Sequence, residues 1–117
     1  MRIEIRGRNV EITDELRRQV ALGMKPIEPQ VPRQARCEVV LREETNPAID
    51  DRYVAEANLH LKGSTLHAHE ASPEMGRTVH SLVADMRRQV KKYRDKRRGR
   101  ARARRLAERA RKGGRVA

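Results

Sequence analysis

Positive charge is concentrated in the last third of this 117-residue chain, and this limits where a hydrophobic core can form. Residues 77–117 contain 17 Lys/Arg and 3 Asp/Glu, a net charge of +14, whereas residues 1–76 contain 11 Lys/Arg and 13 Asp/Glu. Residues 96–117 are rich in Arg and Ala and contain a single leucine, Leu106, so they cannot bury a core of their own. The fold must therefore be built from roughly the first 95 residues, enough for one domain.

An alternation of apolar and polar residues predicts a β-hairpin in the middle of the chain. The apolar positions recur at every second residue and comprise Tyr53, Ala55, Ala57, Leu59 and Leu61. Gly63-Ser64 suits a two-residue turn with glycine first, which pairs Lys62 with Thr65. In that register the inward face sets Leu61, Leu59 and Ala57 opposite Leu66, Ala68 and Glu70. On the outward face, His60 is expected to lie opposite His67.

Residues before the hairpin predict a strand, a helix and a second strand. Residues 2–6 alternate charged residues with Ile3 and Ile5, as a half-buried strand does. Thr13 is expected to cap a helix whose apolar residues are Leu16, Val20, Met24 and Ile27. Pro26 and Pro29 are expected to end this helix in a loop. The next strand places Cys37, Val39 and Leu41 on one face.

A long amphipathic helix is predicted after the hairpin. Ser72 suits an N-cap and Pro73 the first helical turn. The apolar stripe that follows consists of Met75, Val79, Leu82, Val83, Met86, Val90 and Tyr93. The opposite face is polar and mostly basic, so the helix is expected to pack on a sheet with its basic side outward.

The predicted order of elements is β-α-β-β-β-α. This order favours an α+β fold, a two-layer sandwich in which a four-stranded sheet carries two helices on one face. Residues 1–98 are expected to form the domain and residues 99–117 a basic, Arg-rich tail. Such a tail is either disordered or a helix extension that becomes ordered on its partner.

The charge balance indicates a polyanionic partner. A net charge of +12 and a pI of about 11.1 favour nucleic acid or an anionic surface. No apolar run approaches the roughly 20 residues that span a bilayer, and charged residues interrupt any N-terminal signal segment. A lone cysteine is typical of a protein of the reducing cytoplasm. We therefore expect no membrane partner.

Candidate catalytic and metal-binding residues are few. His60, His67 and His69 fall on the outer face of the hairpin, but no carboxylate or thiolate clearly completes a zinc site, so an ordinary polar face is favoured. Cys37 alternates with buried positions and is expected to be an inert thiol. No Ser/His/Asp set, carboxylate pair or phosphate-binding glycine loop is visible. We expect no enzyme activity, no cofactor, no metal and no small-molecule substrate.

The basic side of the last helix is the main candidate for RNA binding. A solvated helix face usually mixes charges of both signs, whereas residues 77–117 carry almost only positive charge. Both tyrosines, Tyr53 and Tyr93, fall on core-facing positions, so recognition is expected to use phosphates and shape rather than base stacking. The predicted RNA-binding residues are Arg17, Arg18, Lys25, Arg77, Arg87, Arg88, Lys91, Lys92, Arg94, Lys96 and Arg98.

Three sets of residues, in order along the chain, resemble the ribosome hibernation promoting factor family, which includes ribosome-associated inhibitor A (protein Y). They are Glu11-Ile12-Thr13 with Leu16-Arg17, the hairpin residues 57–61 and 66–68, and the run from Arg88 to Lys96. The resemblance covers about residues 1–98 and fits either a short form or the N-terminal domain of a long form. It implies binding to ribosomal RNA in the decoding region of the small subunit, where messenger and transfer RNA would be blocked and translation inhibited. It also implies a cytoplasmic, ribosome-associated protein.

By position, several basic residues match basic positions of that family: Arg17, Arg88, Lys92, Arg94 and Lys96. Three positions depart from its usual pattern. Gly76 replaces a usual tyrosine, His80 a usual acid and Asp85 a usual lysine. We therefore do not expect this chain to make the family's contacts at these three positions.

Three other functions compete with this interpretation. A constitutive basic ribosomal protein or RNA chaperone would fit the Arg/Ala-rich tail, but not the ordered resemblance. A protein–protein regulator, as the older family label of sigma-factor modulation suggests, gives no reason for so basic a C-terminal third. A zinc hydrolase would require metal at the histidines.

Overall fold

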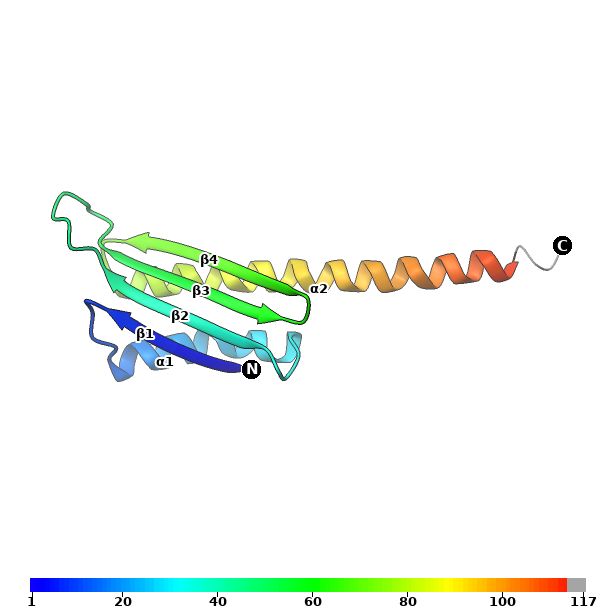
Figure 1. Cartoon of the computed structure of the whole chain (residues 1–117), viewed down its shortest axis with the longest axis horizontal. Helices are drawn as coiled ribbons and strands as arrows, with labels where there is room; N and C mark the ends of the chain where they lie inside the picture. The colour runs from blue at the N-terminus through cyan, green and yellow to red at the C-terminus, as the bar shows by residue number, and fades with distance from the viewer. Residues whose placement is uncertain (114–117) are drawn as a thin grey trace.

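The computed structural model describes residues 1–113, with side chains through residue 111, as one sheet covered on one face by two helices (Figure 1). The elements in chain order are β1 (Arg2–Arg8), α1 (Asp14–Met24), the 3-10 helix η1 (Lys25–Gln30), β2 (Arg36–Glu43), β3 (Tyr53–Leu61), β4 (Ser64–Ser72) and α2 (Met75–Gly113). The predicted order β-α-β-β-β-α and the two-layer α+β fold are confirmed.

The strand order in the sheet is β1-β2-β3-β4. β1 and β2 are parallel because α1 carries the chain back to the starting end of the sheet, whereas the other neighbours are antiparallel. One apolar row crosses all four strands, in which Ile5 pairs with Val39, Val39 with Ala57, and Ala57 with Ala68. This row points toward the helices and fixes which face of each strand is buried.

The hairpin is confirmed, but the predicted register was wrong. Leu61 pairs with Ser64 rather than with Leu66, so the turn residues are Lys62 and Gly63. Gly63 takes the second turn position with φ +76, a conformation that glycine adopts without strain, whereas Lys62 keeps a negative φ. Leu59 now faces Leu66 and Ala57 faces Ala68, whereas the predicted register set Ala57 opposite Glu70. The shift moves each pairing by two residues, so every side chain stays on its predicted face.

The core lies between the sheet and the two helices. Cys37, Val39 and Leu41 of β2 are fully buried, as predicted. The predicted apolar stripe of α2 is buried from Met75 to Val90, and Tyr93 packs against the edge of the same cluster. The core cluster also takes in Val20 and Met24 of α1 and Ile27 of η1, which places both helices on the same face of the sheet.

Both helices differ from prediction at one end. α1 ends at Met24, and the proline-containing segment that was expected to be a loop forms η1 instead, with Ile27 buried. α2 was expected to begin at Pro73 with Ser72 as its N-cap. It begins at Met75 instead, and Ser72 is the last residue of β4. The Ser72 hydroxyl still accepts the N–H of Glu74 (3.3 Å) and lies 2.6 Å from the hydroxyl of the buried Thr78. The serine therefore stabilises the strand-to-helix corner.

α2 is much longer than the sheet that it covers. Its 39 residues correspond to about 58 Å, and the molecule measures 74 × 28 × 18 Å. Beyond Tyr93 the helix projects past the sheet into solvent (Figure 1). Of the two states considered for the tail, residues 99–113 take the helical one; residues 114–117 lie outside the described part.

Candidate nucleic-acid interface

One row of basic side chains runs along α2 on the side away from the sheet. Its members are Arg77, Arg88, Lys91 and Arg98, spaced by 11, 3 and 7 residues, so they recur on one side of the helix. All four are exposed, opposite the buried stripe. Among the described residues, the only ion pair of this row joins Arg88 to Asp85 at 3.6 Å, with 66% of the Arg88 side chain exposed. We call these four residues the outer stripe.

Arg87 lies at the junction of the two helices. Its Nε donates a hydrogen bond of 3.1 Å to the backbone carbonyl of Gly23, one residue before the end of α1. A cation is favoured there because the last carbonyls of a helix lack intrahelical partners and carry partial negative charge. Arg87 thus joins α2 to α1 while its side chain remains exposed.

Three of the predicted RNA-binding residues lie on α1 or directly after it. Arg17 and Arg18 lie on α1, and Lys25 is the residue at which α1 passes into η1. All three are exposed. Since α1 and α2 pack on the same face of the sheet, these cations belong to the helical side of the molecule, as do those of the outer stripe.

Arg94, predicted to bind RNA, makes contacts within the protein. Its Nη1 donates to Oε1 of Gln30 in η1 at 3.1 Å, and its Nε lies 3.7 Å from the carboxylate of Asp95. Only 32% of the side chain is exposed. The structure therefore gives Arg94 an intramolecular role, and its contact with RNA stays a prediction.

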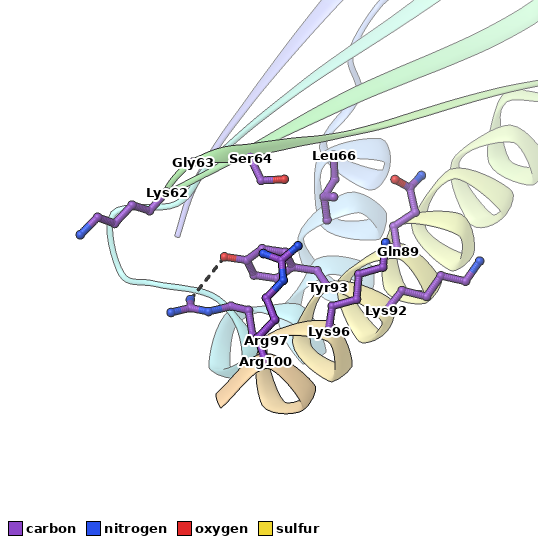
Figure 2. A pocket seen from close by; sticks show the side chains of 10 residues that line it. All are labelled: Lys62, Gly63, Ser64, Leu66, Gln89, Lys92, Tyr93, Lys96, Arg97 and Arg100. Carbon is purple, nitrogen blue, oxygen red and sulfur yellow. Dashed lines mark hydrogen bonds between the residues drawn. The ribbon is translucent and has the colours of Figure 1, made fainter. Parts of the chain in front are cut away.

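Lys92 and Lys96 line a groove between α2 and the β3–β4 turn (Figure 2), with Lys92 four residues after Arg88 of the outer stripe. The groove has a volume of ≈ 880 Å³. Five cations line it: Lys62, Lys92, Lys96, Arg97 and Arg100. Leu66 and Tyr93 supply its apolar part, and Arg97 Nη1 donates to the Tyr93 hydroxyl at 3.3 Å. We call it the turn groove.

The prediction from sequence missed Lys62, Arg97 and Arg100. A signal for the two arginines was present, because positions 97 and 100 follow Tyr93 at the same spacing of four and three that links the buried residues before it. Lys62 lies in the turn, and no sequence periodicity could bring it to α2.

The outward histidines each have a different neighbour. His60 pairs with Thr65 and not with His67, because of the corrected register. Its Nε2 lies 3.6 Å from Glu38, and the Nε2 of His69 lies 3.6 Å from Glu56. The Nδ1 of His67 lies 2.7 Å from the side-chain oxygen of Asn58. Within the described residues, no group of three potential ligands is arranged to hold a metal ion.

Cys37 is a buried thiol. Burial, with a smaller contribution from the negative charge of Glu38, raises the pKa of the Cys37 thiol to about 11. The predicted burial of Cys37 is confirmed, and a thiol held in its protonated form is expected to be a poor nucleophile. Among residues 1–113, no helix combines the length and apolar character needed to cross a membrane.

Comparisons with known proteins agree on one family. Residues 3–98 match the family model described as Sigma 54 modulation protein / S30EA ribosomal protein. The ribosome hibernation promoting factor of Klebsiella oxytoca is 32% identical over 96 residues, which cover 82% of this chain and 96% of that protein. The protein of the same name from Escherichia coli K12 is 31% identical over the same length and coverage.

Two solved structures share the fold. The N-terminal domain of Thermus thermophilus Protein Y aligns with a TM-score of 0.67 and 24% identity, covering 80% of this chain and 99% of that one. A ribosomal subunit interface protein from Coxiella burnetii aligns with a TM-score of 0.68 and 23% identity, covering 81% and 99%. The part of α2 beyond Arg98 lies outside the family match.

Proposed function

Because the chain belongs to the Sigma 54 modulation protein / S30EA ribosomal protein family, we propose that it is a ribosome hibernation factor acting at the decoding region of the small subunit. There it would bind ribosomal RNA, exclude messenger and transfer RNA, and inhibit translation. Its location would be the cytoplasm, on ribosomes. We assign it no catalytic step, since occupation of an RNA surface requires none.

The observation that supports this proposal most directly is the outer stripe. Arg77, Lys91 and Arg98 are exposed and have no recorded acidic partner among the described residues, so their charges are available to an external anion. Arginine and lysine on a rigid helix bind phosphates, and each phosphate neutralised releases counterions into solution. A helix that is already folded loses little conformational entropy when it binds.

The two helices also present their cations on the same side of the molecule. The Arg87–Gly23 hydrogen bond holds α2 against the end of α1, near Lys25. A rigid pair of helices with fixed cations suits folded RNA, whose backbone is recognised by shape. We therefore propose Arg17, Arg18, Lys25 and Arg87 as further contacts beside the outer stripe, with Lys92 and Lys96 in the turn groove.

The proposal is tested by sedimentation with small ribosomal subunits. We expect the wild-type protein to pellet with empty subunits, and to pellet less when messenger and transfer RNA fill the decoding region. Cell-free translation should fall as protein is added. Equal pelleting with empty and filled subunits would contradict occlusion of that region.

A pair of charge reversals tests the surface itself. Arg88→Glu with Lys91→Glu changes the net charge by four units within one turn of the outer stripe. The matched control, Arg8→Glu with Arg52→Glu, makes the same change at the far end of the sheet, where both residues are exposed. We expect the first pair to lower affinity for subunits at least about tenfold and the control to lower it far less. Equal losses would mean that only net charge matters.

A further inference from the structure

We propose that the turn groove binds successive phosphates of a single RNA strand, as a second contact on α2 beside the outer stripe. This inference rests on the proposed RNA-binding role and names a further site for it. The groove is formed by two segments that are far apart in the sequence, the β3–β4 turn and the second half of α2.

The groove exists because α2 is longer than the sheet. Val90 is buried against the sheet and Tyr93 lies at its edge, near the turn. The same side of the helix continues with Arg97 and Arg100, which are exposed and line the groove beside the β3–β4 turn. The core-facing side of α2 therefore changes from apolar to basic at the point where the sheet ends.

The charge in the groove is of one sign. Its five cations line one concavity, and no carboxylate of the described part of the chain lines it. Arginines on the sheet are placed differently: Arg2 lies 3.4 Å from Glu4, Arg36 lies 3.6 Å from Glu38, and Arg42 lies 3.1 Å from Glu44. Cations gathered without counter-charges repel one another, and a bound polyanion relieves that repulsion.

The arrangement of the cations favours a chain of phosphates over a single one. Lys92, Lys96 and Arg100 follow one another at intervals of four residues, which is about 6 Å of helix rise per step. They form a row along the helix, and Lys62 lines the same groove from the turn. A free phosphate needs cations around one point, whereas a strand needs them along a line.

The Arg97–Tyr93 pair favours a nucleic acid over a simpler polyanion. Tyr93 was expected to be a core residue unable to stack with bases, but it lies at the edge of the core and lines the groove. The Arg97 guanidinium lies 5.8 Å from the centre of the Tyr93 ring, and its hydrogen bond to the tyrosine hydroxyl fixes its orientation. Unpaired bases stack on aromatic rings and on guanidinium planes. A duplex keeps its bases stacked inside, so the groove is matched to a single strand.

The binding experiment uses the full chain and a labelled oligouridylate of about 10 nucleotides. The groove variant is Lys62→Glu with Arg97→Glu, and the matched control is Arg8→Glu with Arg52→Glu. We expect the groove variant to bind about tenfold more weakly at about 0.1 M salt, and the control to stay within about threefold of wild type. The slope of log affinity against log salt should become shallower by about 1.4 in the groove variant, since two phosphate contacts are lost.

A footprint locates the strand independently of affinity. Ser64 lines the groove, so a Ser64→Cys variant places a thiol there, while the native Cys37 is buried and does not compete for the label. Asp51→Cys supplies an exposed control thiol in the loop before β3. We expect oligouridylate to slow maleimide labelling at position 64 and to leave labelling at position 51 unchanged.

Four results would overturn the inference. They are no binding of the oligonucleotide by the wild-type protein, equal affinity of the groove and control variants, no protection at position 64, or displacement of the probe by inorganic tripolyphosphate at equal concentration. The last would assign the groove to a small polyanion. Failure of the wild-type protein to pellet with small subunits, with the groove results intact, would instead contradict the proposed function and leave the groove as an RNA site.

Discussion

Arg94 of α2 donates from Nη1 to Oε1 of Gln30 in η1 across 3.1 Å, joining the long helix to the short one. The amide of Gln30 in turn donates from Nε2 to the carbonyl of Pro26 at 2.9 Å. These bonds hold η1, which supplies the buried Ile27, against the last core turn of α2 before it leaves the sheet. A residue that the sequence marks as an RNA contact therefore also stabilises the fold.

We predict that Arg94→Met lowers the free energy of unfolding by about 1 kcal/mol, because the methionine keeps the alkyl packing and loses the charged hydrogen bond. The partial exposure of the side chain keeps this figure at the lower end of the range for charged donors. Urea denaturation measures it. The exposed Arg98→Met, one turn later, serves as control and should stay within about 0.5 kcal/mol of wild type. Unchanged stability with weakened RNA binding in Arg94→Met would reverse this assignment.

A second prediction concerns the crossing of α1 and α2, where Gly23 faces Val83. A Cβ at position 23 would lie 2.7 Å from Cγ1 of Val83 and 2.8 Å from Cγ2. These methyl groups are attached directly to a stiff branched carbon, so relief requires the helices to move apart. Gly23→Ala should therefore cost about 1–3 kcal/mol from overpacking, in spite of the better helix propensity of alanine.

Gly76 provides the matched control for that substitution. It also lies in a helix, but a Cβ there would meet nothing within 4 Å. Gly76→Ala should stabilise the protein by about 0.4–1 kcal/mol through the unfolded state. Thermal unfolding of the two single variants, and of Gly23→Ala with Val83→Ala, checks the pair. A stabilised Gly23→Ala variant would mean that the helices do not approach as closely as described.

Local patterns in the sequence were sufficient for the fold and insufficient for parts of the site. The alternation in β3 and the stripe from Met75 to Val90 fix which faces are buried, since each pattern depends only on near neighbours. The hairpin register was wrong by one turn position because both Gly63-Ser64 and Lys62-Gly63 fit a tight turn, and either register keeps every side chain on the same face.

Contacts between distant segments could not be predicted. Arg94 and Gln30 are 64 residues apart, and no local pattern links them. Lys62 belongs to the turn, and it becomes part of a basic groove only because α2 passes beneath that turn. The basic residues on the exposed side of α2 were found because helical spacing alone places them there. Their contact with RNA stays a prediction.

A third prediction concerns the reactivity of Cys37. At about pH 8, a thiol with a pKa of about 11 has roughly 100-fold less thiolate than one at the ordinary value of 9.0. Ellman's reagent should therefore react with the folded protein at least about 100-fold more slowly than with the protein in guanidinium. Comparable rates would show that the thiol is accessible.

The same shift predicts loss of stability at alkaline pH. Because the pKa of Cys37 is raised on folding, the folded protein holds the thiol proton more tightly than the unfolded chain. This contribution is fully present below about pH 9 and is lost as the pH rises through about 11. We expect the melting temperature of wild type to fall more between these pH values than that of Cys37→Ala. Parallel decreases would contradict the shift.

A further prediction separates the outward face of the sheet from the RNA surface. His60, His67 and His69 lie beside Glu38, Asn58 and Glu56 on the face opposite the helices. Replacing the three histidines with alanine should leave affinity for small subunits within about threefold of wild type, since they contribute no phosphate contact. Metal analysis of the purified wild-type protein should find no stoichiometric zinc. A large loss of affinity would extend the interface to the sheet.

The last prediction concerns the end of α2. Deletion of residues 99–117 removes the helical residues 99–113, whose described side chains are all exposed, so the midpoint of urea unfolding should change little. Ribosome affinity should fall, but less than in the Arg88→Glu/Lys91→Glu variant. The segment places like charges four residues apart, as in Arg100 and Arg104 or Arg105 and Arg109, and such pairs destabilise an isolated helix by about 0.2–0.5 kcal/mol each. Part of the energy of binding is therefore used to hold this segment in its helical form, whereas Arg88 and Lys91 lie on a part of the helix that packs against the core.

Affinity for small subunits, measured from about 50 to 200 mM salt, separates the loss of phosphate contacts from the cost of forming the helix. The truncation should reduce the salt dependence as well as the affinity, since phosphate contacts are removed together with the arginines. A truncation that lowers affinity more than the charge reversal would place the principal RNA contacts beyond residue 98, outside the part of the chain that matches the family.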